Sequence, residues 1–334
     1  MTADFWDHIQ TNAKKSGEPF FSLAPMEAVT DSVFRQVVAK AAAPDVFNTE
    51  FTNALSITHP KAKFSVMGRL HVSPNEQQRP VVQLWGDQPE AFARAAEAVK
   101  NQGFKAIDLN MGCPDSTVVK NGGGSDLIRH MQTAADVITA SKMAGLPVSV
   151  KTRLGFSRVD EMNDWLPWLL RQDVRVLTVH LRTRKEMSKV SAHFELIDQI
   201  VKMRDKIAPQ TMLQINGDIK TRRQGIELAE QHPGLDGIMI GRGIFENPYC
   251  FEKTPQRHSL GELLDLFEFQ LDLYDQYVAE VGPKRFEALR RFFKIYVRGL
   301  AEAAKYRDRL VNTHSSDEAR AIITELRERA CSLS

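Results

Sequence analysis

Short apolar runs alternate with helix-like segments between residues 20 and 241, and this alternation constrains the fold most strongly. Most runs are followed by a segment in which apolar residues recur at helical spacing, as in 90–99 and 194–201. Such alternation produces a parallel sheet covered by helices. The eight runs, bounded by glycine, proline or polar residues, are 20–26, 46–51, 80–86, 106–114, 148–154, 174–181, 212–216 and 237–241. Eight units predict an α/β fold, a closed (β/α)8 TIM barrel.

An open, doubly wound sheet is the alternative architecture. That fold carries a G-x-G-x-x-G sequence after its first strand, and the residues that follow 20–26 contain none. The closed barrel is therefore favoured. A barrel of this kind needs roughly 250 residues, whereas the chain has 334. We expect a barrel over residues 1–255 and a small all-α domain over 256–334.

The last eighty residues or so read as helices only, with 260–280, 284–306 and 315–332 as the expected elements. The first is acidic and the second is cationic. Within the second, Arg291, Lys294 and Arg298 follow a helical spacing and would share one face. Two interpretations stay open at this point: the cations bind RNA, or they pair with the acidic helix beside them.

Composition narrows the classes of protein to which the chain could belong. No apolar run approaches the roughly 20 residues that span a membrane, and the amino terminus lacks the pattern of a secretory signal. We therefore expect a cytoplasmic protein without a membrane segment, and a monomer. Cys113, Cys250 and Cys331 are too far apart in the sequence to indicate a disulfide framework or a zinc site, so no metal is expected. The net charge of +2 does not by itself indicate a nucleic-acid partner.

Polar side chains gather where the predicted strands end, which is where a barrel of this type binds its ligand. These residues are Pro25, Met26, Gln83, Asn110, Cys113, Lys151, Arg153, His180, Arg182, Thr183, Asn216, Gly217, Asp218, Gly241 and Arg242. Taken singly, each has an ordinary structural explanation: a rim charge for Lys151, a core histidine for His180, an inert buried thiol for Cys113. Their coincidence at one end of one barrel favours a ligand site.

The chemistry of these strand ends points to flavin mononucleotide (FMN). Glycines let backbone N–H groups approach a phosphate, and Arg242 adds a forked cation after the eighth strand. Lys151 suits a ring that gains negative charge on reduction, and Gln83 can both donate to and accept from a flat heterocycle. Asn110, Cys113, His180 and Arg182 would face a second ligand lying on the flavin.

Six segments taken together resemble the tRNA-dihydrouridine synthases. They are Ala-Pro-Met-Glu-Ala-Val-Thr-Asp (24–31), Gln-Leu-Trp-Gly (83–86), Asp-Leu-Asn-Met-Gly-Cys-Pro (108–114), Lys-Thr-Arg-Leu-Gly (151–155), His-Leu-Arg-Thr (180–183) and Ile-Gly-Arg-Gly (240–243). The resemblance covers nearly the whole chain. It implies an NADPH-driven FMN enzyme that reduces the C5–C6 double bond of a uridine in tRNA, with hydride added to C6 and a proton given to C5 by Cys113.

The resemblance also implies roles for individual residues. Those expected to bind FMN are Pro25, Met26, Gln83, Lys151, His180, Asn216, Gly217, Asp218, Gly241 and Arg242. Those expected to bind the substrate are Asn110, Arg153, Arg182, Thr183, Lys284, Arg290, Arg291, Lys294 and Arg298; of the cofactor residues, Lys151 and His180 could also reach the uracil edge or its phosphate. The uridine would have to be flipped out of the folded tRNA to reach the barrel.

Two features depart from the family pattern. Leu181 stands where a glycine is usual and is expected to narrow the flavin or base pocket; the loop after Cys113 also lacks the Lys or Arg that many members carry soon after Pro114. The glycine-rich loop 121–125 and the segment 49–51 favour the bacterial branch that acts on uridine 16 of the D-loop. Two alternatives remain: an FMN barrel that acts on a free pyrimidine, as dihydroorotate dehydrogenases do, and an RNA-binding module in which flavin chemistry is secondary.

Overall fold

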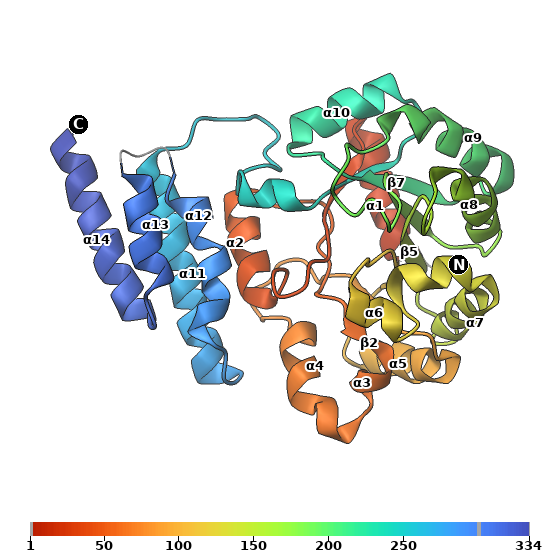
Figure 1. Ribbon diagram of the computed structural model, residues 1–334, viewed down its shortest axis with the longest axis horizontal. Coiled ribbons are helices and arrows are strands. Elements are labelled where there is room, and N and C mark those ends of the chain that lie inside the picture. Colours follow the sequence, from red (N-terminus) through yellow and green to blue (C-terminus); the bar gives the residue numbers. More distant parts are fainter. Residues whose placement is uncertain (1–2, 299–301, 334) are drawn as a thin grey trace.

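The computed structural model describes residues 3–298 and 302–333, without the side chains of 63–65 and 330–333. A barrel fills one side of the molecule and a group of helices the other (Figure 1). The strands are β1 (Phe20–Leu23), β2 (Thr52–Asn53), β3 (Val82–Trp85), β4 (Ile107–Met111), β5 (Val148–Arg153), β6 (Val176–His180), β7 (Met212–Asn216) and β8 (Gly237–Ile240). They form one parallel sheet in the order β1-β8-β7-β6-β5-β4-β3-β2. The prediction of an eight-stranded barrel is confirmed.

The second strand differs from its prediction. Residues 46–51 were expected to form a regular strand, but the structure has single parallel bridges, Ser22 with Val46 and Asn48 with Val81, before the short β2. Side chains replace part of the ladder here: the Asn48 amide donates to the Leu23 carbonyl oxygen (2.9 Å), and the Thr49 hydroxyl accepts from the Gln83 N–H (3.1 Å). These contacts close the ring between β1 and β3.

Helices surround the strands. They are α1 (Phe5–Ser16), α2 (Ser32–Ala42), α3 (Ala54–Ile57), α4 (Lys63–Leu70), α5 (Pro89–Asn101), α6 (Ser116–Lys120), α7 (Met131–Lys142), α8 (Met162–Leu170), α9 (Ile197–Ile207) and α10 (Arg222–Gln231), with short 3-10 helices at Pro60–Ala62, Gly124–Arg129, Val159–Glu161, Phe194–Leu196 and Arg242–Phe245. Trp6 and Ile9 of α1 pack against Phe20, Val176 and Met212, which lie at strand starts. Because α1 covers the amino ends of the strands, a ligand reaches the barrel from the carboxyl ends.

The C-terminal region contains α11 (Leu260–Glu280), a 3-10 helix (Phe286–Arg291), α12 (Phe293–Tyr296), α13 (Ala303–Val311) and α14 (Ser316–Leu333). The prediction of one helix over 284–306 is wrong. Phe292, Phe293, Ile295 and Tyr296 are all buried, so the segment is apolar on more than one face and is held by tertiary contacts instead of presenting one exposed side. The Tyr296 hydroxyl donates to Gln270 of α11 (2.6 Å).

Candidate active site

A cavity of about 990 Å³ opens at the carboxyl ends of the strands. It is lined by Ala24, Pro25, Met26, Lys151, His180, Asn216, Gly217, Asp218, Ile219, Lys220, Gly241, Arg242, Gly243, Phe245, Glu246, Lys294, Arg298 and Arg307. The wall thus includes every residue predicted to bind the cofactor except Gln83. It also includes three cations from the C-terminal region, so the cavity lies between the barrel and the helices that follow it.

The loops after β7 and β8 form one end of the cavity. Gly217 has φ +123°, and a side chain there would also approach Ala192 Cβ to 3.1 Å, so the position requires glycine. The Asp218 carboxylate accepts hydrogen bonds from the Arg182 guanidinium and the Ala192 N–H, and the Arg182 bond holds the pKa of Asp218 below its usual value. Arg242 lies 3.4 Å from the other oxygen of the same carboxylate, and its side chain is 63% exposed, so it places a solvent-accessible cation at this end.

Lys151 of β5 and His180 of β6 line the middle of the cavity. Burial, reinforced by the charge of Arg153, lowers the pKa of Lys151 to about 8. Burial and the charges of Arg153 and Lys151 also hold the pKa of His180 well below its usual value, so its imidazole is neutral at pH 7. Its Nδ1 is buried and, among the described residues, has no hydrogen-bond partner. A polar ligand is the natural partner for such an atom.

Gln83 and Asn110 lie inside the barrel and connect the strands to the cysteine. Gln83 donates to Asp108 Oδ2 (2.6 Å) and accepts from Asn110 Nδ2 (3.0 Å). Asn110 Oδ1 in turn accepts from the backbone N–H groups of Cys113 (2.9 Å) and Gly112 (3.2 Å). This chain of amides fixes the backbone at Cys113. Gln83 is fully buried and lies outside the cavity wall.

Cys113 is half-buried directly after β4. The glycine-rich loop folds over it: the Ser125 N–H donates to the Cys113 carbonyl oxygen (3.0 Å), and a side chain at Gly124 would come within 2.8 Å of that oxygen. Burial raises the pKa of the Cys113 thiol, against the opposing effects of the Asp115 N–H, Lys151 and Arg153. The thiol is therefore protonated at neutral pH and can serve as an acid.

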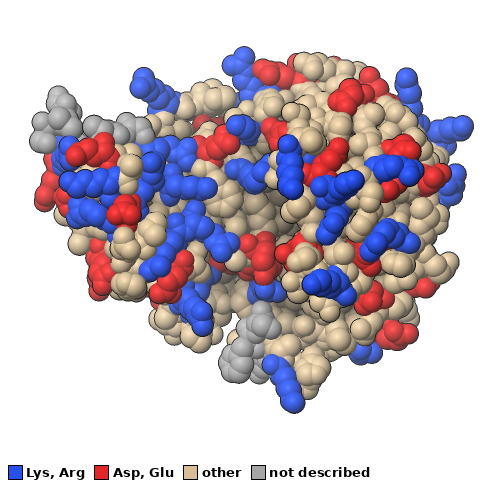
Figure 2. Space-filling view, in the orientation of Figure 1, with Lys and Arg blue, Asp and Glu red and all other residues tan. Residues whose placement is uncertain are grey.

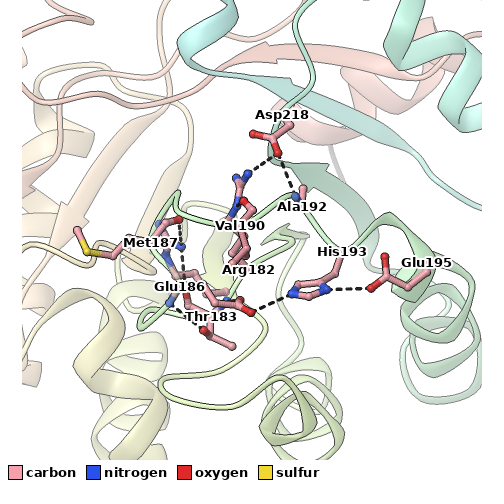
Figure 3. Close-up of polar contacts among 10 residues, drawn as sticks. Arg182, Thr183, Glu186, Met187, Val190, Ala192, His193, Glu195 and Asp218 are labelled. Atoms are coloured by element: carbon pink, nitrogen blue, oxygen red, sulfur yellow. Dashed lines mark hydrogen bonds and ion pairs between the residues drawn. The ribbon is translucent and has the colours of Figure 1, made fainter.

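Arg153 and Arg182 are both buried and bind backbone carbonyls. Arg153 donates to the carbonyl oxygens of Gly112 (2.7 Å), Thr183 (3.0 Å) and Met187 (3.2 Å). Arg182 donates to the Val190 carbonyl oxygen (2.7 Å) and pairs with Asp218, as Figure 3 shows. Burial, reinforced by the charge of nearby Arg182, lowers the pKa of Arg153 to about 10. The two guanidinium groups hold the loop after β6, while Arg182 Nη1 is buried without a partner among the described residues.

Leu181 corrects one expectation. It is fully buried within the hydrophobic core and does not line the cavity, so the prediction that it narrows the pocket is wrong. Thr183 is buried as well, and its backbone N–H donates to Glu186 Oε2 (2.7 Å). The direction of a side chain after a strand end decides whether it reaches the cavity, and the motif does not reveal this direction for Leu181 or Thr183.

Comparison with known proteins identifies the family. The family model described as "Dihydrouridine synthase (Dus)" matches residues 22–331. A "Probable tRNA-dihydrouridine synthase" of Staphylococcus aureus (strain MRSA252) is 53% identical over 325 residues, which cover 97% of this chain and 96% of that protein. A "Probable tRNA-dihydrouridine synthase 2" of Bacillus subtilis (strain 168) is 53% identical over 326 residues, covering 97% of each chain. The chain belongs to the dihydrouridine synthase family.

Solved structures support the fold of this dihydrouridine synthase family member. Morphinone reductase matches with a TM-score of 0.50 at 14% identity, over 69% of this chain and 84% of that one. A 2-naphthoyl-CoA reductase matches with a TM-score of 0.52 at 9% identity, over 90% of this chain and 55% of that one. At these identities the likeness concerns the barrel architecture alone.

The predicted cations of the C-terminal region have different surroundings in this family member. Lys294 and Arg298 line the cavity, whereas Arg291 is exposed and donates to the Glu27 carbonyl oxygen (3.3 Å). Lys284 is paired with Asp31 of the barrel, and Arg290 donates to the Thr313 carbonyl oxygen (3.0 Å). Arg307, which is not among the predicted site residues, lines the cavity too. Only the return of the chain through α13 brings it there.

Four acidic residues of α11 pair with arginines of α14. Arg320 binds Asp272 and Asp275, and Arg327 binds Asp265 and Glu268. Within the described ranges, no carboxylate forms an ion pair with Arg291, Lys294, Arg298 or Arg307. The interpretation that the cationic segment neutralises the acidic helix is therefore wrong. Figure 2 shows Lys and Arg side chains over the C-terminal helices and, across a hollow, over the barrel.

In the part of the chain that the structure describes, no group of three or more His, Cys, Asp or Glu side chains could hold a metal ion. No described helix combines the length and apolar character of a membrane span. Cys250 is buried in the core, and the side chain of Cys331 lies outside the described residues.

Proposed function

We propose that this protein is an FMN-dependent, NADPH-driven tRNA-dihydrouridine synthase that reduces the C5–C6 double bond of a uridine in tRNA. The names of the relatives that are 53% identical support this activity. The observation that carries it is the position of the half-buried Cys113, which follows β4 next to β5, the strand whose Lys151 lines the cavity together with His180. A strand-end thiol acid and a flavin-sized cavity are the two parts that this reaction requires.

The cavity residues fit a flavin. The buried, unpartnered Nδ1 of His180 needs a polar partner, and Lys151 places a cation beneath the same opening. Gly217 and Gly241 line the cavity without side chains at the end where Arg242 supplies a forked cation for a phosphate. The imidazole of His180 is neutral, so it can donate or accept a hydrogen bond without competing with Arg242 for the charge of the phosphate. Asp218, already bound to Arg182, would orient this end rather than contact the anion.

Reduced flavin, replenished by NADPH, would supply the hydride that is added to C6 of the uracil. The protein must then deliver one proton to C5, and Cys113 is suited to this step because burial keeps its Sγ protonated. Asn110 holds the Cys113 backbone N–H, and Arg153 holds the adjacent Gly112 carbonyl oxygen. These contacts fix the backbone that carries the thiol. Hydride and proton together convert the double bond into the 5,6-dihydro product.

The tRNA would lie over the cavity, with the target base flipped into the barrel. Lys294, Arg298 and Arg307 line the opening without carboxylate partners among the described residues, and Arg291 is exposed nearby. Phosphate binding is the role that such cations serve best. The barrel, residues 1–255, would carry the chemistry and residues 256–334 the grip on tRNA. We expect a cytoplasmic monomer that acts on the D-loop, at uridine 16.

A purified sample tests the proposal directly. Incubation with unmodified tRNA and NADPH should form dihydrouridine, detected by mass spectrometry of the digested nucleosides, and the protein should bind FMN with its yellow absorbance. A free-pyrimidine reductase would instead turn over orotate or uridine and ignore tRNA. An RNA-binding module would bind tRNA without forming product. The unpaired cations at the cavity favour the tRNA enzyme over a free-pyrimidine reductase, since a small substrate has no use for them.

A further inference from the structure

The loop between β6 and α9 has features that the proposed chemistry does not use. Residues 181–193 contain no regular element, and loops of this length in compact domains are usually functional. The stretch 184–191 carries three cations, Arg184, Lys185 and Lys189, and one acid, Glu186. We propose that residues 184–191 form a second RNA-binding surface on the barrel side of the cavity, which contacts the phosphate backbone beside the flipped uridine. This inference rests on the proposed tRNA substrate.

Buried arginines make this loop rigid. Arg153 binds the carbonyl oxygens of Thr183 and Met187, and Arg182 binds that of Val190. Asp218 of the β7 loop accepts from the Ala192 N–H (3.0 Å), so the loop is tied to β5, β6 and the end of β7 (Figure 3). A surface that is already ordered loses little conformational entropy when it binds.

The charges of the loop are available to an external anion. Lys185 and Lys189 are exposed, and within the described residues neither forms an ion pair. Glu186 is occupied: it accepts from the Thr183 N–H and lies 3.0 Å from His193 Nε2. The Arg184 guanidinium lies 5.1 Å from the centre of the Phe156 ring, and its Nε has no partner among the described residues. The loop therefore presents a net positive surface.

The position of the loop favours RNA as its partner. The Arg153 guanidinium reaches both Met187 and Gly112, and Gly112 precedes Cys113, so one side chain links the loop to the thiol. Cations of the C-terminal region lie on the far side of the hollow (Figure 2). A flipped nucleotide has a phosphate on each side, so a basic surface on each side of the opening fits its backbone. Exposed Met187 and Val190 would pack against ribose or base.

The test compares two matched double variants. Lys185→Ala/Lys189→Ala removes the proposed contacts. Lys202→Ala/Lys206→Ala removes two exposed lysines with the same four-residue spacing from α9, on the outside of the barrel. Affinity for unmodified tRNA is measured for both variants and for the unchanged protein between about 50 and 200 mM salt. FMN content and melting temperature report on the fold of each variant.

The first variant should bind tRNA roughly tenfold more weakly, with a salt slope smaller by about two, one for each lost phosphate contact. The α9 variant should match the unchanged protein. Wild-type affinity and slope in the first variant would overturn the inference. Loss of self-association in that variant, with tRNA binding intact, would also overturn it and assign the loop to protein contacts. If the unchanged protein neither binds tRNA nor forms dihydrouridine, the proposed function itself has failed.

Discussion

The barrel mouth and the C-terminal region both supply residues to one cavity, but they do so by different physical routes. In the barrel, Lys151, His180 and Asn216 lie together because parallel strands end at a common edge. In the C-terminal region, helical spacing predicted one cationic face, yet the helix is broken and each cation has its own surroundings. Topology determines position in the first region, and individual tertiary partners determine it in the second.

Lys284 and Lys294 illustrate the difference most clearly. Both are cations of the same predicted helix, yet Lys284 is paired with Asp31 against the barrel and Lys294 lines the cavity. A lysine that is buried in an ion pair stabilises the contact between the two regions; one without a carboxylate partner can attract an anion. We therefore expect substitutions in the two regions, and even at two cations of the same predicted helix, to impair different properties: stability in one case and anion binding in the other.

The largest effect is expected in the barrel. Cys113→Ala should lower the rate of dihydrouridine formation by about 10²- to 10⁴-fold, because no other acid replaces the thiol at C5. FMN content and tRNA affinity should be retained. Cys250→Ala is the control, since Cys250 is buried in the core away from the cavity. Product formed at the normal rate by Cys113→Ala, measured by nucleoside mass spectrometry, would contradict the proton-donor role.

The next largest effect is a loss of stability at the contact between the two regions. Lys284→Met leaves the Asp31 carboxylate without its ion-pair partner and should lower the free energy of unfolding by about 3 kcal/mol. Adding Asp31→Asn should restore most of this loss, because asparagine removes the charge and still caps α2. Chemical denaturation measures both variants. Reduced tRNA affinity with unchanged stability in Lys284→Met would return Lys284 to the RNA-binding residues.

A smaller effect is expected at the exposed cations at and near the cavity. Arg291→Ala/Lys294→Ala should weaken tRNA binding by roughly tenfold and reduce the salt slope by about two, while stability is unchanged. Each side chain is exposed and lacks a carboxylate partner among the described residues, so little structure depends on it. The matched control is Lys202→Ala/Lys206→Ala on α9, where both lysines are exposed and lie outside the cavity wall. Unfolding at lower denaturant concentration would show that these cations are structural, as Lys284 is.

The smallest effect concerns pH. Lys151 has a pKa lowered to about 8, so its charge is present below pH 8 and is lost above it. FMN binding to the flavin-free protein should therefore weaken severalfold between pH 7 and pH 9, as followed by fluorescence titration. Lys151→Met should bind more weakly at pH 7 and lose this pH dependence. An identical pH dependence in Lys151→Met would assign the titration to another group.

The sequence was sufficient for most of the barrel and for nine of the barrel residues that line the cavity. Strand ends follow from apolar runs, and residues just after them must meet at one edge of a parallel sheet. The expectations failed where a side chain's direction mattered. Leu181 points into the core, and the segment at 46–51 uses side-chain contacts instead of a regular ladder.

By itself, the sequence determined the (β/α)8 architecture, the strand-end cluster around Cys113 and the presence of a cationic segment after the barrel. These follow from local periodicity and from the common edge of parallel strands. Only the tertiary structure decided which arginines bind backbone, which lysine is paired and which cations line the cavity. Those outcomes depend on partners distant in the sequence, such as Asp31 for Lys284 and Asp218 for Arg182, and no local pattern records such a pairing.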